Sequence, residues 1–196
     1  MTFLALSYQM ITYEDKADLL AQKIMAHIAR EGLSKLSNFS HLAKAIGKGR
    51  SLLYFYFKNE DEILDALYKQ YVFEINYHFD HVRSQKFGFI DYVHYLVEIK
   101  DLYFFTINCA KIVEHRPELT RFIEHGLSTL DAYCFEQFVA HYHLDQHPPS
   151  NVSFVFSCFR SLWWERSGPY ESWTNEKVST MVDDIDVFIE ESMNVT

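Results

Sequence analysis

The segment from Asn38 to Lys58 constrains the fold most, because it contains two short helical patterns on either side of a glycine. The first pattern is an apolar stripe at three- and four-residue spacings. It consists of Phe39, Leu42, Ala43 and Ile46. Asn38 or Ser37 can cap its amino end, and Gly47 can adopt the left-handed conformation at which helices often stop. The pattern predicts a helix-turn-helix.

The second helix of this motif is expected to begin near Arg50 and to have two different faces. Leu53 and Phe57 lie on one face and can reach back to the first helix. Arg50, Ser51 and Tyr54 lie on another face and stay available to a partner. Such a polar outer face suits the major groove of DNA, so DNA is the leading candidate partner.

Charge is distributed unevenly along the chain. The formal net charge of -9 argues against a protein that coats nucleic acid with its whole surface. Residues 1–70 carry nine basic and eight acidic side chains, whereas the remaining 126 residues carry nine and nineteen. Between Arg30 and Lys58 there are six basic residues and one acidic residue. One small basic patch on an acidic molecule fits local contact with phosphates.

From about Glu14 to Leu67 the chain resembles the amino-terminal domain of the tetracycline-repressor (TetR) family. The residues that carry the resemblance are Leu42-Ala43, Gly47 and Leu53-Tyr54-Phe55-Tyr56-Phe57-Lys58. The resemblance implies an all-α, dimeric protein of about nine helices. It further implies a helix-turn-helix DNA-binding domain over residues 14–60, followed by a helical effector-binding and dimerisation domain over 61–196.

Three residues depart from the family pattern. Lys48 replaces a small apolar residue after the turn glycine, and Gly49 replaces the serine that usually opens the recognition helix. Glu60 stands where relatives often have a lysine that touches a phosphate. We expect Glu60 instead in the first turn of the next helix, where the helix dipole favours negative charge.

Arg50 is the best candidate for DNA contact, because its forked donors can pair with guanine or with a phosphate. Tyr54 matches a family tyrosine that commonly bonds a phosphate, and Tyr56 sits where a histidine or tyrosine does likewise, although core packing also explains Tyr56. The full predicted set is Asn38, Ser40, Lys48, Arg50, Ser51, Tyr54, Tyr56 and Lys58.

The rest of the chain reads as consecutive helices. A supporting helix over about 14–31 precedes the motif, and a long helix over about 60–82 follows it as a lever between the two halves. Residues 87–115 fit one helix or two helices joined near Lys100. Further helices are expected over about 117–143, 151–166 and 174–193, separated by the prolines at 148 and 149 and by the turn at 167–170.

The family resemblance implies an effector pocket in the carboxy-terminal half and a dimer interface on the last two helices. Candidate pocket residues are Phe73, Tyr77, Tyr92, Tyr95, Tyr103, Asn108, Phe135 and Trp163, although ordinary core packing explains most of them equally well. Candidate interface residues are Val155, Phe159, Val178, Val182, Ile185 and Phe188. Because few of the pocket candidates are cationic, a neutral or cationic effector is favoured over an anion.

Other classes of function find little support. Cys109, Cys134 and Cys158 are widely spaced in apolar contexts, which favours a reduced cytoplasmic protein over a redox sensor. His78 and His81 share a helical face, but no cysteine joins them, so no metal site is expected. No di-iron, zinc-protease or phosphate-loop motif is present, so we expect no enzyme and no cofactor. Residues 1–13 are apolar but short and indicate neither a signal peptide nor a membrane span, and Met10 is an alternative start.

The sequence therefore predicts a DNA-binding transcriptional regulator, most simply a ligand-responsive repressor that binds a palindromic operator as a homodimer. Two alternatives remain open. One is an architectural DNA binder of the same fold without an effector. The other is a ligand- or protein-binding module that has lost DNA binding, which Gly49, Glu60 and the acidic total make conceivable.

Overall fold

The computed structural model describes residues 13–33 and 38–194, and these residues fold into α-helices, short 3₁₀ turns and one π-helical turn, without a strand. The α-helices are α1 (Tyr13–Glu31), α2 (Phe39–Ala45), α3 (Arg50–Tyr56), α4 (Glu60–Ser84), α5 (Phe89–Glu98), α6 (Lys100–Ile112), α7 (Thr120–Gly126), α8 (Ala132–His141), α9 (Pro149–Arg166) and α10 (Asn175–Asn194). The predicted segment before Tyr13 and the alternative cap Ser37 lie outside the described residues.

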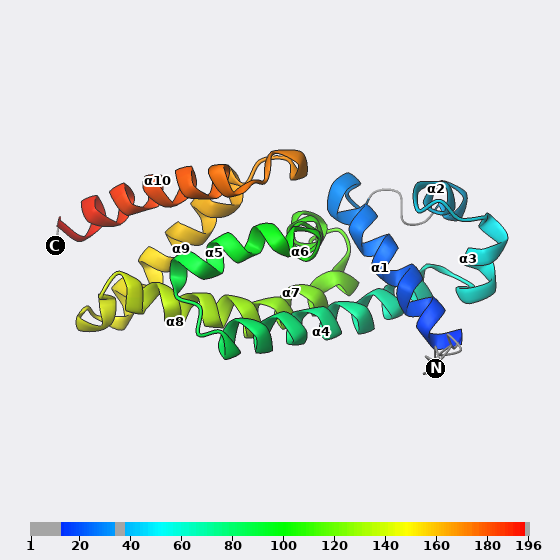
Figure 1. The fold of residues 1–196 in the computed structure, drawn as a ribbon, viewed down its shortest axis with the longest axis horizontal. Helices are drawn as coiled ribbons and strands as arrows, with labels where there is room; N and C mark the ends of the chain where they lie inside the picture. The colour runs from blue at the N-terminus through cyan, green and yellow to red at the C-terminus, as the bar shows by residue number, and fades with distance from the viewer. Residues whose placement is uncertain (1–12, 34–37, 195–196) are drawn as a thin grey trace, which may run out of the picture.

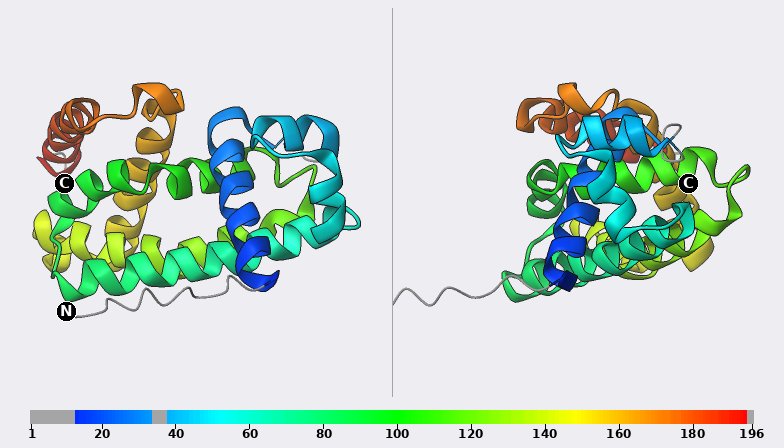
Figure 2. Two further views of the ribbon diagram at one scale, coloured as in Figure 1. Left: turned by 45° about the vertical axis from the view of Figure 1, so that its right-hand side comes forward. Right: turned by 90° about the vertical axis from the view of Figure 1, so that its right-hand side faces the viewer.

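The molecule is elongated, with α2 and α3 at one end of its long axis and the carboxyl end of α10 toward the other (Figure 1). Helix α4 begins near α3 and runs from there into the larger helical part. Helix α1 crosses α4 and packs against both α4 and α6 (Figure 2). The unit that contains α2 and α3 is thereby connected to the larger helical part through two separate helices.

The predicted helices are confirmed with small changes at their ends. The segment expected over residues 87–115 forms two helices, because the backbone bends at Ile99 between α5 and α6. A π-helical turn over Leu127–Asp131 joins α7 and α8 without a break, so the ten α-helices form nine rods among the described residues. Helix α9 begins at Pro149, two residues before its predicted start, since proline is well suited to a first helical turn.

One continuous apolar core runs through the molecule and is rich in aromatic rings. Phe89 and Phe138 are buried, as is Phe159, and their rings contact one another at centroid distances of 4.9–5.5 Å. Trp173 is almost fully buried and stacks on Tyr103. None of the helices in the described part of the chain is both long enough and apolar enough to cross a membrane.

Candidate functional site

The helix-turn-helix forms for the local reasons that its sequence indicates. The Asn38 side-chain oxygen accepts a hydrogen bond of 3.0 Å from the backbone N–H of His41 and so caps α2. Gly47 ends the first helical segment with a φ of 67°, which a residue with a side chain rarely adopts. Leu42 and Leu53 are buried, on α2 and α3 respectively, so the two helices share a core. This packing fixes the orientation of α3.

Arg50 and Tyr54 form an ordered pair on the outer face of α3. The Arg50 Nη2 donates to the Tyr54 hydroxyl at 3.2 Å, and the guanidinium carbon lies 5.1 Å from the centre of the tyrosine ring. The same ring packs on Phe39 of α2 at 4.8 Å. Both Arg50 and Tyr54 are exposed to solvent. The remaining guanidinium N–H groups make no hydrogen bond with any described residue and can bind a base or a phosphate.

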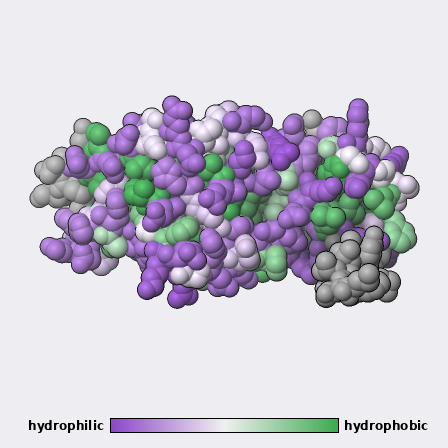
Figure 3. All heavy atoms as spheres, viewed as in Figure 1, coloured by the Kyte–Doolittle hydropathy of each residue, from purple (hydrophilic) through white to green (hydrophobic). Residues whose placement is uncertain are grey.

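The other predicted DNA-binding residues surround this pair. Asn38, Ser40, Lys48, Ser51 and Lys58 are all exposed. Tyr56 is half-buried, and its ring contacts Phe55 and Phe57, so both of its expected roles fit its position. In the space-filling view, apolar residues interrupt the hydrophilic surface around the α2 and α3 end (Figure 3). The surface there is mixed rather than uniformly polar.

Glu60 is half-buried and its charge is paired with an arginine of the same chain. It opens α4 as expected, after the cap that Asn59 supplies to the Glu62 backbone N–H at 2.9 Å. Its carboxylate accepts from Arg116 Nη2 at 2.6 Å, and the same guanidinium donates to Glu118 at 2.7 Å. The glutamate that departs from the family pattern therefore connects the start of α4 to the segment between α6 and α7.

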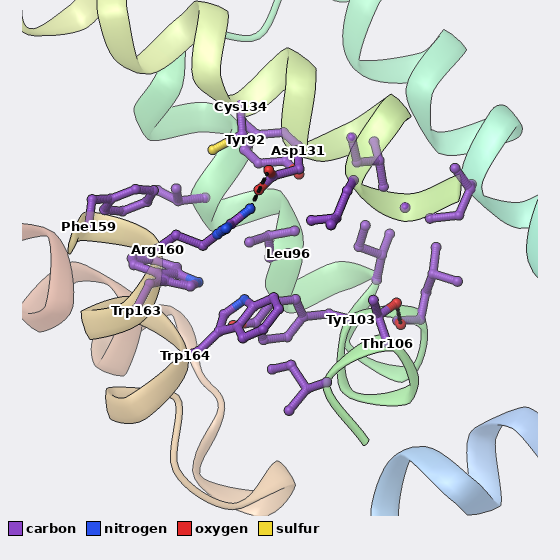
Figure 4. A pocket seen from close by; sticks show the side chains of 18 of the residues that line it. Tyr92, Leu96, Tyr103, Thr106, Asp131, Cys134, Phe159, Arg160, Trp163 and Trp164 are labelled. Carbon is purple, nitrogen blue, oxygen red and sulfur yellow. Dashed lines mark hydrogen bonds and ion pairs between the residues drawn. The ribbon is translucent and has the colours of Figure 1, made fainter. Parts of the chain in front are cut away.

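A cavity of about 100 Å³ lies between α4, α5, α6, α9 and the continuous rod of α7, the π-helical turn and α8. Among the candidate pocket residues, Tyr92, Tyr103 and Trp163 line it. Its walls also include Phe159 and Trp164, so most of its surface is aromatic or aliphatic. Figure 4 shows these side chains directed into one space from different helices.

The structure places the other five candidate pocket residues away from this cavity. Phe73 and Tyr77 lie on the outer face of α4 and are 64% and 59% exposed. Tyr95 is not part of the cavity wall and bonds His78 Nδ1 of α4 at 2.7 Å. Phe135 packs edge-on against Phe156. Since an aromatic residue on a helix can face the core, a cavity or solvent, residue type alone could not distinguish these positions.

Asn108 is the fifth of these residues, and its side chain lies beneath α1. Its amide N–H₂ donates to the carbonyl oxygens of Ile28 at 2.9 Å and of Ala29 at 3.1 Å. The Ile28 carbonyl also accepts from the Gly32 backbone N–H at 2.9 Å, so the amide adds a second bond there and supplies a partner to the Ala29 carbonyl near the carboxyl end of α1. Asn108 therefore connects α6 to the helix-turn-helix unit.

The π-helical turn brings residues into the cavity that sequence reasoning missed. Leu127, Leu130 and Asp131 of this turn all line the cavity. Gly126 precedes the turn and lies against Tyr71, because a Cβ atom there would be 2.5 Å from the tyrosine hydroxyl oxygen. The Tyr71 hydroxyl in turn bonds Thr106 of α6 at 3.0 Å. A π-turn inside a helix is frequent at functional sites.

Asp131 and Arg160 are the two charged residues among the described residues that line the cavity. The Arg160 Nη1 lies 3.1 Å from an Asp131 carboxylate oxygen, and its guanidinium carbon lies 5.9 Å from the ring centre of Trp164. Burial raises the pKa of Asp131, while the charge and hydrogen bond of Arg160 oppose the shift. A single charge within an otherwise apolar stretch is the sequence signal that could have indicated both residues.

No protein-family model matches the sequence, and no curated protein matches it. The structure of a candidate TetR-family transcriptional regulator from Rhodococcus sp. superposes with a TM-score of 0.61 at 14% sequence identity. The match covers 88% of this chain and 98% of that one. The chain has the TetR fold.

The TetR fold confirms the predicted all-α class and element order, and it locates the last two helices, α9 and α10, side by side. Most of the predicted interface residues on them lie in the core of the single chain. Val155, Phe159, Val178, Val182 and Ile185 are buried within the single chain, and Phe188 is half-buried. Their apolar stripes pack on the core of their own chain. The exposed large apolar residues on α9 and α10 are instead Phe154 and Val187, at 69% and 56% exposure.

The histidines do not gather into a metal site on this TetR-type scaffold. Within residues 13–33 and 38–194, no group of three or more histidine, cysteine, aspartate or glutamate side chains could hold a metal ion. His78 bonds Tyr95 and also lies 3.5 Å from Glu74, and His81 stacks on Tyr95. These two histidines are part of a polar network between α4 and α5.

Proposed function

We propose that this protein is a sequence-specific DNA-binding transcriptional regulator. The observation that carries the proposal is the exposed Arg50–Tyr54 pair on α3, which the buried contacts of α2 and α3 hold in a fixed orientation. A recognition helix presents such side chains to base edges in the major groove. The TetR fold and the basic segment between Arg30 and Lys58 support the same function.

The proposed regulator acts as a homodimer on a palindromic operator. A single helix-turn-helix offers few contacts, whereas two related copies bind two half-sites. We propose residues 14–60 as the DNA-binding domain and residues 61–196 as the domain for effector binding and dimerisation. The exposed sides of α9 and α10, with Phe154 and Val187, are the proposed dimer surface.

The regulator is further proposed to release DNA when a small molecule occupies the cavity, which is the behaviour of a repressor that is relieved by its effector. Helix α4 supports this coupling because only three residues separate it from α3 and it contributes Tyr71 and Ile75 to the cavity wall. Helix α6 supplies a second connection, since Thr106 and Ile107 line the cavity while Asn108 holds α1. Ligand and DNA would each favour a different arrangement of these helices.

The test is selection of bound fragments from a genomic DNA pool, followed by a salt titration on any enriched site. We expect a palindrome whose affinity falls steeply with salt. Arg50→Ala should weaken binding by about 1–3 kcal/mol per half-site contact, and Tyr54→Phe should weaken it by less. Arg83→Ala is the matched control, because Arg83 is an exposed arginine at the far end of α4.

Two results would contradict the proposal. One is the absence of any enriched sequence with a protein that is folded by circular dichroism. The other is equal affinity of the Arg50→Ala and Arg83→Ala variants for the selected site, since the recognition helix would then make no contribution.

A further inference from the structure

Polar groups gather at one end of the otherwise apolar cavity. Tyr92 comes from α5, Asp131 from the π-helical turn and Arg160 from α9, and Figure 4 shows the three side chains at the same end of the cavity. The charge of Asp131 also contributes to raising the pKa of Tyr92, after burial and the effect of Cys134, which agrees with their proximity. We call this group of three residues the polar corner.

The hydrogen bonds already present show which atoms of the cavity remain available. The Tyr71 hydroxyl bonds Thr106, and the Tyr103 hydroxyl bonds Ser167 Oγ at 2.7 Å. The Tyr92 hydroxyl, in contrast, makes no hydrogen bond with any residue that the structure describes, although Tyr92 is only 5% exposed. The Tyr92 oxygen is not one of the fully buried side-chain atoms that lack a partner, so it is open to the cavity space, and a ligand there can supply the bond.

The charge balance of the polar corner limits the charge of a ligand. Asp131 and Arg160 neutralise each other at 3.1 Å, and the surrounding wall is apolar. The pair itself is partly open to solvent, since the side chains of Arg160 and Asp131 are 37% and 27% exposed. A carboxylate or an ammonium group placed against the apolar wall would still add a charge without a counter-ion, which is disfavoured there. A neutral group that both donates and accepts hydrogen bonds satisfies the corner without disturbing the ion pair.

The remaining wall limits the size and shape of the ligand. The cavity has a volume of about 100 Å³. A dry engineered cavity of about 150 Å³ admits benzene, so this smaller space limits the ligand to no more than a single ring. Phe159, Trp163 and Trp164 present aromatic side chains to it, and aromatic pairs favour stacked or edge-to-face contact with another ring.

We propose that the cavity binds a neutral one-ring aromatic alcohol of the phenol class, with its hydroxyl at the polar corner and its ring among the aromatic side chains. The ligand hydroxyl accepts a hydrogen bond from Tyr92 and donates one to the carboxylate oxygen of Asp131 that Arg160 leaves unused. This inference names the effector class for the ligand response proposed above and rests on that function for its biological role.

Calorimetric titration of the whole protein with four probes of similar size tests the inference. The probes are phenol, benzoate, benzylamine and toluene. We expect phenol to bind tightest, because benzoate and benzylamine introduce an unpaired charge and toluene leaves Tyr92 without a partner. Tighter binding of either charged probe, equal binding of toluene and phenol, or no phenol binding at millimolar concentration would each overturn the proposal.

Tyr92→Phe provides the first variant, because it removes one hydroxyl that makes no bond in the folded protein. Phenol should then bind about tenfold more weakly, because one hydrogen bond to the ligand is lost. Tyr95→Phe is the matched control: Tyr95 is on the same helix but lies outside the cavity, so the phenol affinity should be unchanged. Equal effects of the two variants would show that the Tyr92 hydroxyl does not contact phenol.

Two charge variants add an independent readout. Asp131→Asn leaves the charge of Arg160 unpaired and should raise the affinity for benzoate relative to phenol. Arg160→Gln should raise the affinity for benzylamine relative to phenol. Unchanged preferences in both folded variants would contradict the role of the polar corner. All of these titrations are done without DNA, so loss of operator binding and loss of phenol binding are separate outcomes.

Discussion

Gly126 is the residue at which a single methyl group is expected to disturb the core most. A Cβ atom there would lie 2.5 Å from the Tyr71 hydroxyl oxygen, and Tyr71 is fully buried and bonded to Thr106. Because the rigid ring cannot swing aside, Gly126→Ala should reduce the free energy of unfolding by about 1–3 kcal/mol. Urea denaturation measures this change directly.

Removal of the tyrosine hydroxyl supplies the control for this prediction. In a Tyr71→Phe background the contact disappears, and alanine then has a helix propensity that is better than that of glycine by about 1 kcal/mol. The cost of Gly126→Ala should therefore vanish or change sign in that background. An equal cost in both backgrounds would locate the effect elsewhere than at this contact.

The three cysteines should differ in reactivity for reasons of burial. Burial raises the pKa of the Cys109 thiol to about 12 and raises the pKa of Cys134 well above its usual value. Both thiols are therefore protonated and inaccessible at neutral pH, whereas Cys158 is partly exposed. Reaction of the native protein with an aromatic disulfide reagent should label Cys158, and unfolding should release the other two. Fast labelling of Cys109 in the native state would contradict this.

At the scale of the helices, local sequence signals determined what could be predicted. The cap at Asn38 and the stop at Gly47 were readable because each satisfies a backbone requirement within a few residues. The π-helical turn at Leu127–Asp131 has no comparable local marker, so its effect on the direction of Asp131 could not be predicted. A pocket residue such as Trp163 could be guessed from its type, but the side chains that share the cavity with it depend on packing between distant helices.

One amide group adds hydrogen bonds to the extensive packing between α1 and α6. Asn108 donates to two carbonyl groups in the last turn of α1, so Asn108→Ala leaves both without this partner. We expect a loss of about 1–2 kcal/mol in the free energy of unfolding and weaker operator binding, because α1 supports the helix-turn-helix. Asn151→Ala is the control, since Asn151 is exposed in the first turn of α9. Equal stability of the two variants would show that the two hydrogen bonds of Asn108 contribute nothing to the free energy of unfolding.

At the scale of the whole molecule, the charge distribution and the elongated shape both distinguish the end that contains α2 and α3 from the rest. The basic segment between Arg30 and Lys58 includes α2 and α3 at one end, while most of the negative charge belongs to the residues after position 70. Repulsion between DNA and the acidic part favours approach through the α3 end. In the dimer proposed above, two α3 helices bind two half-sites, so the opposite part of the molecule is the part that would hold the two copies together.

The proposed dimer surface can be tested at Phe154, whose side chain is 69% exposed on α9. A glutamate there would place charge into an apolar contact between two copies, which should convert the dimer to a monomer by light scattering. Operator affinity should fall at least about tenfold, because a monomer binds only one half-site. Phe73→Glu is the matched control: Phe73 is 64% exposed on α4 and lies outside the proposed surface. A dimer that persists in Phe154→Glu, or one that dissociates equally in Phe73→Glu, would move the interface away from this face of α9.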